Sequence, residues 1–230
     1  MKKITQYYYD GEAVKETYAI DGNGTRQGLY KSYYYGGQVE VEFTYKDGKH
    51  NGPYKLYYRN GQLKEKGVYK NGRLNGVVEK YRRDGKLYEK ITYKNDKKNG
   101  LYLLYDKTGL LRTKNTYKNG KENGLQEQYY YNGQLAIRAT YKDGRREGPW
   151  ETYNPNGTVL QKGCYRNGKF IDEKDLAKER DRLNKVLRRM ARGVGGSSSP
   201  KATQRGKAAA SRAQCAVPAP RKKKGGNEGM

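Results

Sequence analysis

The sequence predicts an all-β protein, an elongated single-layer antiparallel ribbon of β-hairpins that repeats every 24 residues. A glycine followed five residues later by a tyrosine recurs six times at that spacing, from Gly28 to Gly148. Eleven Asn-Gly and five Asp-Gly pairs lie almost all at the turns expected between strands. The chain holds 25 tyrosines but only 2 phenylalanines and 1 tryptophan, and tyrosine suits a thin, half-exposed sheet.

The segment from Gly52 to Asn75 shows how one unit is built. Residues 53–58 have the length and aromatic content of a strand. The pair Asn60-Gly61 offers the two positive-φ positions of a type I′ turn, and a second strand follows over residues 62–70. Each unit is therefore expected to supply two strands, and about 4.8 Å per strand gives a sheet roughly 60–70 Å long.

Alternation along these strands predicts which side chains share a face. The repeated columns represented by Tyr57, Leu63 and Tyr69 are expected to form one continuous ladder on one side of the sheet. Asp96 stands where the other units carry the glycine of an Asn-Gly or Asp-Gly turn. Since aspartate tolerates a left-handed conformation less readily than glycine, we expect that turn to be looser.

The 24-residue repeat, and the point at which it stops, divide the chain into four segments. Residues 1–27 read as a degenerate N-terminal cap repeat, and residues 28–170 as six hairpin repeats. Residues 171–192 are predicted to form an amphipathic helix. Residues 193–230 contain no aromatic residue and are rich in glycine, serine, alanine, proline and basic residues, which predicts a disordered basic tail.

The predicted helix carries apolar side chains on one face, and Asp172 can cap its start. We expect it to lie on the last repeat and cover an otherwise open sheet edge. Binding of a partner by this helix is the alternative. The apolar positions are Leu176, Leu183, Leu187 and Met190.

The composition is strongly basic, with a net charge of +25 and a mean hydropathy of −1.23. Such a field attracts acidic proteins, nucleic acid or anionic lipid, although surface lysines also serve to keep exposed strands soluble. No signal peptide and no run of about 18 apolar residues is evident, so a cytoplasmic location is expected. A candidate anion-binding run in the tail is Arg221, Lys222, Lys223 and Lys224.

Residues for catalysis or metal binding are missing from the pattern. His50 is the single histidine and stands near a turn, so no histidine-containing triad or histidine-rich metal site can be assembled. Cys164 lies in a column that holds threonine in most other units, which makes it a sheet residue. We therefore predict no catalytic, cofactor-binding or metal-binding residues, no cofactor, and a protein that is not an enzyme.

The repeating units resemble the MORN repeat variant family. Residues 52–76, GPYKLYYRNGQLKEKGVYKNGRLNG, and residues 124–148, GLQEQYYYNGQLAIRATYKDGRREG, show the pattern most fully, and the resemblance covers about residues 7–169. The repeating units are similar to those of the family members that bacterial genomes carry as antitoxin-type proteins. The resemblance implies an antiparallel ribbon of hairpins and a non-enzymatic interaction role, and MORN-type repeats scaffold many partners. The segment 171–230 departs from the family pattern.

The leading functional hypothesis is a protein-binding repeat scaffold, whose specific form would be the antitoxin of a toxin–antitoxin pair. One alternative is a basic adaptor that binds anionic phospholipid or nucleic acid through the sheet and tail. Another is a viral or symbiont structural repeat protein. Tyrosine and tryptophan are enriched among interface hot spots. The candidate partner-binding residues are accordingly Tyr57, Tyr81, Tyr105, Tyr129, Tyr153 and Trp150.

Overall fold

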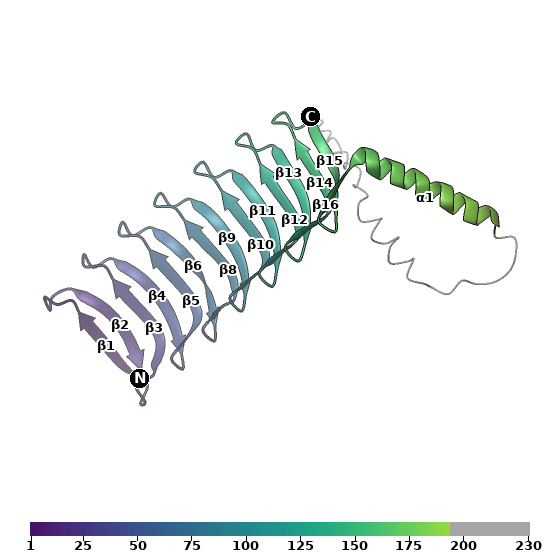
Figure 1. The fold of residues 1–230 in the computed structure, drawn as a ribbon. Helices are drawn as coiled ribbons and strands as arrows, with labels where there is room; N and C mark the ends of the chain where they lie inside the picture. The colour runs from purple at the N-terminus through teal and green to yellow at the C-terminus, as the bar shows by residue number, and fades with distance from the viewer. Residues whose placement is uncertain (194–230) are drawn as a thin grey trace, which may run out of the picture.

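A computed structural model describes residues 1–193, and most of the predicted tail lies outside them. Among these residues sixteen strands form one antiparallel sheet in which strands that follow each other in sequence are paired, except that the short β7 pairs only with β6, which also pairs with β8 (Figure 1). The strands are β1 (Lys2–Tyr7), β2 (Val14–Ile20), β3 (Arg26–Tyr33), β4 (Val39–Lys46), β5 (Lys49–Tyr57), β6 (Leu63–Lys70), β7 (Arg73–Leu74), β8 (Gly76–Tyr81), β9 (Leu87–Lys94), β10 (Lys97–Tyr105), β11 (Leu111–Lys118), β12 (Lys121–Tyr129), β13 (Leu135–Lys142), β14 (Arg145–Tyr153), β15 (Val159–Arg166) and β16 (Lys169–Asp172).

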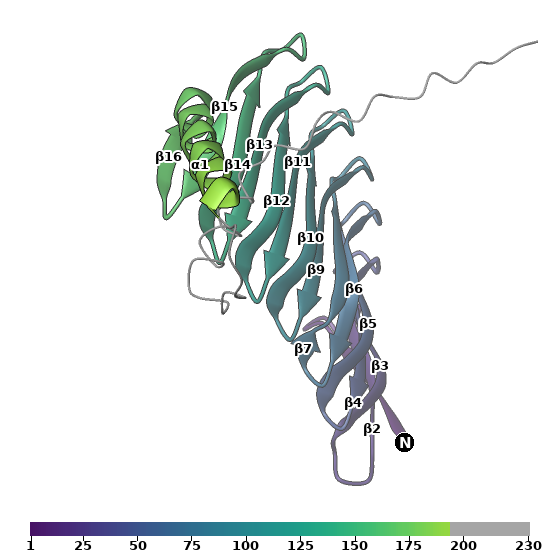
Figure 2. The same cartoon turned by 90° about the vertical axis from the view of Figure 1, so that its right-hand side faces the viewer.

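The sheet is a single open layer, as the sequence predicts. Figure 1 shows the strands side by side along the length of the ribbon, and Figure 2 shows that the sheet twists from one end to the other. Within the described residues, each strand of the repeats contacts essentially only the strands beside it, and no second layer covers either face. Burial must therefore come from neighbours on the same face.

Turns of two kinds alternate along the chain, and each kind occupies its own long edge of the sheet. At one edge the turn Asn71-Gly72 has positive φ at both residues, 51° and 80°, which defines a type I′ turn. At the other edge only Gly61 has positive φ, 80°, and Asn60 does not. The prediction of a type I′ turn at Asn60-Gly61 is therefore wrong.

Hydrogen bonds explain the geometry of this second kind of turn. The amide of Gly61 donates to the carbonyl of Tyr58 at 2.9 Å, and the amide of Tyr58 donates to the carbonyl of Gln62 at 2.9 Å. The side-chain oxygen of Asn60 accepts from the amide of Gln62 at 3.1 Å, which holds Asn60 out of the left-handed region. The result is a three-residue loop that ends in a glycine bulge.

The turn at Asp96 is not looser than the others, contrary to expectation. Asp96 adopts a left-handed φ of 63°, and the flanking residues Lys94 and Lys97 pair directly across it, as in the neighbouring turns. Its carboxylate accepts a hydrogen bond of 2.7 Å from the amide of Leu74 in the preceding unit. We attribute the regular geometry to this bond, which offsets the cost of a left-handed aspartate.

A thin core lies on one face, which we call the aromatic face. It contains a row of directly opposed residues, and in places a large side chain meets a glycine, as Tyr54 does opposite Gly67 and Trp150 opposite Gly163. Residues of this row are among the most buried of the described chain, with Tyr54 at 3% exposure and Ile91 at 2%. The row runs through Tyr30, Phe43, Tyr54, Gly67, Val78, Ile91, Tyr102, Asn115, Gln126, Ala139, Trp150 and Gly163.

The predicted ladder of Tyr57, Leu63 and Tyr69 on one side is wrong. The ring of Tyr69 lies 5.0 Å from that of Tyr54 on the aromatic face, whereas the hydroxyl of Tyr57 donates to Glu42 on the opposite face. A β-bulge in each unit shifts the register beyond the turn. Strict alternation cannot anticipate that shift, because one residue is left without a partner.

Within the part of the chain that the structure describes, one helix, α1 (Glu173–Gly193), follows the last strand. The carboxylate of Asp172 accepts a hydrogen bond of 2.8 Å from the amide of Asp175, the predicted N-cap. Leu176 is buried against the sheet, but Val186 and Leu187 are exposed. Figure 1 shows the helix projecting beyond the end of the sheet, so it does not lie along the last repeat as a cover.

The close packing around Gly67 in the core row predicts the effect of adding one methyl group there. An added Cβ would lie 2.7 Å from the ring of Tyr54 and 2.9 Å from Val78, closer than packing allows. We expect Gly67→Ala to lower the free energy of unfolding by about 1–3 kcal/mol, measured by thermal and urea denaturation. Gly22→Ala is the control, because nothing lies within 4 Å of its added Cβ. Equal effects of the two substitutions would contradict the packing argument.

Candidate interaction surfaces

The face opposite the aromatic face carries a row of charges across the sheet, and we call it the ladder face. Acidic and basic side chains stand opposite each other on successive strands, so that Glu79 accepts from Lys66 at 2.9 Å and from Lys90 at 2.8 Å. The ion pairs of the row are Lys31–Glu42, Lys55–Glu42, Lys66–Glu79, Lys90–Glu79, Lys114–Glu127, Arg138–Glu127, Arg138–Glu151 and Lys162–Glu173.

The five candidate tyrosines lie beside this row of charges on the ladder face. The hydroxyl of Tyr57 donates to Glu42 at 3.1 Å, that of Tyr129 to Glu127 at 3.1 Å, and that of Tyr153 to Glu151. Burial, together with the neighbouring carboxylate, raises the pKa of each of these three hydroxyls to about 12. Tyr81 and Tyr105 occupy the same column, and all five side chains are half-buried.

The remaining candidate, Trp150, lies on the aromatic face. Its ring centroid is 5.2 Å from that of Phe170 and 6.3 Å from that of Tyr165. The structure therefore brings the five tyrosines together and separates Trp150 from them. His50 also lies on the aromatic face, stacked on Phe43 at 4.3 Å, where burial lowers the pKa of its imidazole.

The ladder face also carries an exposed aliphatic row that the sequence reasoning missed. The row consists of the residue after each opening glycine, and its aliphatic members Leu29, Val77, Leu101 and Leu125 are 54%, 40%, 39% and 39% exposed. The sequence did contain a sign of this row, because the residue after each opening glycine is always leucine, valine or proline. The aliphatic row comprises Leu29, Pro53, Val77, Leu101, Leu125 and Pro149.

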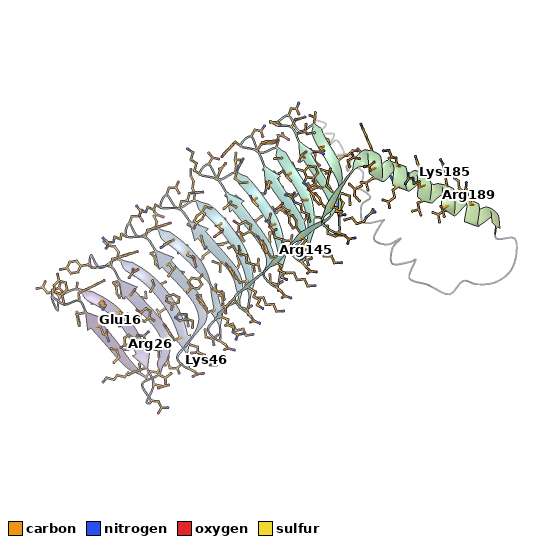
Figure 3. The ribbon with its side chains drawn as sticks, viewed as in Figure 1. Glu16, Arg26, Lys46, Arg145, Lys185 and Arg189 are labelled. Atoms are coloured by element: carbon orange, nitrogen blue, oxygen red, sulfur yellow. The ribbon has the colours of Figure 1, made fainter. Side chains whose placement is uncertain are left out.

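The edge formed by the type I′ turns carries a pair of basic residues at every turn, and we call it the cationic edge. Each of its six turns is flanked by two basic residues that are paired directly across it, and Figure 3 shows Lys46 and Arg145 along this same edge. All but Arg166 are exposed. The pairs are Lys46 and Lys49, Lys70 and Arg73, Lys94 and Lys97, Lys118 and Lys121, Lys142 and Arg145, and Arg166 and Lys169.

The candidate anion-binding run of Arg221, Lys222, Lys223 and Lys224 lies outside the described residues, so that prediction stays a prediction. Within residues 1–193, no three histidine, cysteine, aspartate or glutamate side chains gather as ligands for a metal ion. In the same part of the chain, no helix has the length and hydrophobicity needed to cross a bilayer.

The ion pairs of Glu79 predict a specific pH dependence of stability. Hydrogen bonds from Lys90 and Lys66 hold the pKa of this carboxyl at about 2, below its ordinary value of 4.5. The stabilisation is therefore present above about pH 4.5 and is lost as the pH falls toward 2. We expect Glu79→Gln to remove on the order of 1–2 kcal/mol of unfolding free energy at pH 7, and much less at pH 2.5.

Urea denaturation of wild type and variant across this pH range measures the difference. Glu12→Gln is the control, because Glu12 is exposed and takes part in no ion pair among residues 1–193. A Glu79→Gln effect of the same size at both pH values would show that the ion pairs do not produce the pH dependence.

Comparison with known proteins agrees with this architecture. A search of curated proteins found no match. Five segments match the MORN repeat variant family, at residues 26–47, 51–71, 74–95, 122–143 and 146–167. The stretch between the third and fourth matches folds into the hairpin of β10 and β11 with the same register as its neighbours, so the repeat continues through it. The chain therefore belongs to the MORN repeat variant family, a family of repeats of the scaffold type.

Proposed function

We propose that this protein is a non-enzymatic scaffold that binds a protein partner along its ladder face. The observation that supports this most directly is the aliphatic row. Four of its side chains expose between 39% and 54% of their surface, although they belong to a regular, well-paired sheet. A regular row of exposed apolar side chains bordered by polar residues is typical of a protein interaction site.

The neighbours of the aliphatic row favour a protein partner that lies lengthwise on the ribbon. On one side of the row stands the cationic edge, and on the other stand the paired charges that include Glu79 and Glu127. Successive members of the row are two strands apart, about 9.6 Å. An elongated segment with apolar side chains at matching intervals would bury the row and place polar groups against both flanks.

The five tyrosines of the ladder face would contact the partner at the rim of this interface. Four of their hydroxyls, all but that of Tyr105, already donate to carboxylates of the sheet, as Tyr57 does to Glu42, so these four rings are held in fixed orientations. Such pre-ordered aromatic side chains lose little conformational entropy on binding. Trp150 faces the other way and does not belong to this surface.

The more specific roles stay predictions. Action as an antitoxin and a cytoplasmic location are not features of the sheet geometry, and the proposal does not depend on them. A second candidate function, binding of an anionic partner, is favoured by one observation, the row of basic pairs on the cationic edge.

Substitutions in the aliphatic row test the proposal. We expect Val77→Thr, Leu101→Thr and Leu125→Thr together to weaken partner binding by at least about tenfold, because buried methyl groups are lost and hydroxyls are buried in their place. Threonine already occupies the facing strand at Thr92, Thr116 and Thr140, so the sheet should tolerate it. Folding is checked by thermal denaturation.

The measurement is affinity capture with the tagged full chain from cells that naturally express it, followed by titration of the purified partner. The matched control carries Leu160→Thr, Val186→Thr and Leu187→Thr, three exposed apolar residues outside the row. A partner that is retained by the control and lost by the row variant supports the proposal. Equal loss with both variants, or retention by both, would refute it.

A further inference from the structure

The cationic edge has an arrangement that is unfavourable for the isolated chain. Like charges directly opposite each other on neighbouring strands destabilise a sheet. Here they recur at all six turns, for example where Lys70 stands opposite Arg73 and Lys94 opposite Lys97. The row of charges on the ladder face differs, because its basic side chains reach glutamates. Even Lys55 and Lys66, which stand opposite each other, lie near Glu42 and Glu79. An anionic partner bound at this edge would therefore reduce the repulsion within the like-charged pairs.

Internal ion pairs do not compensate this edge within residues 1–193. Of its twelve basic residues only Arg166 takes part in an ion pair there, with Glu179 of the helix at 3.0 Å. The three aspartates in these turns are engaged in hydrogen bonds instead. Asp47 accepts from Gln27 at 3.0 Å, Asp96 from the amide of Leu74 at 2.7 Å, and Asp143 from Asn123 at 3.2 Å.

One place on the edge is hollowed. Between the turns at Asn71 and Asn95 lies a depression of about 440 Å³ beside the short strand β7. Three cations and three asparagines line it, and they offer ammonium, guanidinium and amide donors. This combination suits the oxygens of a phosphate group. The lining residues are Lys70, Asn71, Arg73, Asn75, Lys94 and Asn95.

The spacing and path of the edge favour a linear, flexible polyanion. Successive basic pairs are two strands apart, so six pairs extend over roughly 50 Å. The sheet twists along its length, and its edge follows that twist (Figure 2). A flat membrane could touch only part of such an edge, whereas a flexible phosphodiester chain can follow all of it.

The opposite edge provides an internal comparison. Its turns mix charges and neutral residues, as in Arg83-Asp84, and some of its cations are engaged with the backbone. Arg82 donates to the carbonyl of Tyr105 at 3.1 Å, and Lys86 to that of Lys107 at 3.3 Å. The unbroken array of basic pairs is therefore a property of one edge and not of turns in general.

We propose that the cationic edge binds single-stranded nucleic acid through its phosphates, with the hollow between the turns at Asn71 and Asn95 as one phosphate site. The contacts are to the phosphodiester backbone, so binding does not depend on base sequence. This inference is independent of the protein-binding surface, because the two surfaces use different side chains.

Charge-matched variants of the full chain test this assignment. The edge variant carries Lys70→Ser, Arg73→Ser, Lys94→Ser and Lys97→Ser. A second edge variant, in case the first fails to fold, changes Lys118, Lys121, Lys142 and Arg145 to serine. The control removes four exposed charges from the opposite edge by changing Arg59, Arg83, Lys86 and Lys107 to serine. All three variants lose the same net charge.

Fluorescence anisotropy of a labelled 40-nucleotide DNA strand of mixed sequence, titrated at several NaCl concentrations, gives the affinity and its salt dependence. We expect each edge variant to bind at least about tenfold more weakly than wild type. The slope of log K against log salt should become shallower by about 3, because four phosphate contacts are lost at about 0.7 each. The control should change the affinity by less than about threefold.

Three results would overturn the proposal. Equal weakening by edge and control variants would assign binding to net charge alone, and unchanged binding by the edge variants would assign it to other residues. Loss of sedimentation with phosphatidylserine vesicles, without loss of DNA binding, would make the edge a membrane surface. Thermal denaturation serves as the folding control, and relief of like-charge repulsion should leave the Tm of the edge variants unchanged or higher.

Discussion

A sheet of one layer can bury a side chain only against neighbours on the same face, and most features of this protein follow from that constraint. Large residues of the aromatic face pack against their neighbours in the row, and Tyr54 lies between the ring of Phe43 and the open space above Gly67. The hydroxyl of a turn tyrosine then links one unit to the next, as where Tyr58 donates to the carbonyl of Tyr81 at 2.8 Å. Stability is thus distributed along the ribbon as contacts between adjacent units.

The same constraint leaves both faces and both edges accessible, and they differ chemically. The aromatic face is occupied by packing, and its rings mainly contact each other. The ladder face pairs its charges but leaves Leu101 and its equivalents uncovered. The cationic edge leaves its charges unpaired within residues 1–193, apart from Arg166. A protein partner and a polyanion could therefore be held side by side on one scaffold.

The architecture was predictable from the sequence because turns and period are local signals. The division of side chains between the two faces was not predictable, because each unit contains β-bulges that no dipeptide in the sequence indicates. The bulge beyond Gly61 moves Tyr57 and Tyr69 to opposite faces. The same local view misjudged Asp96, whose conformation depends on Leu74 in the preceding unit. The aliphatic row was visible as a repeated residue type, but its exposure required knowledge of the bulges.

The two kinds of turn remain on separate edges because every unit contributes an even number of strands. Adding or deleting one whole unit would lengthen or shorten the aliphatic row and the cationic edge together, and would leave the chemistry of each unchanged. An insertion of a single strand would instead exchange the two edges for everything downstream. The length of the ribbon can thus vary in steps of two strands, while each edge keeps its kind of turn and its charge.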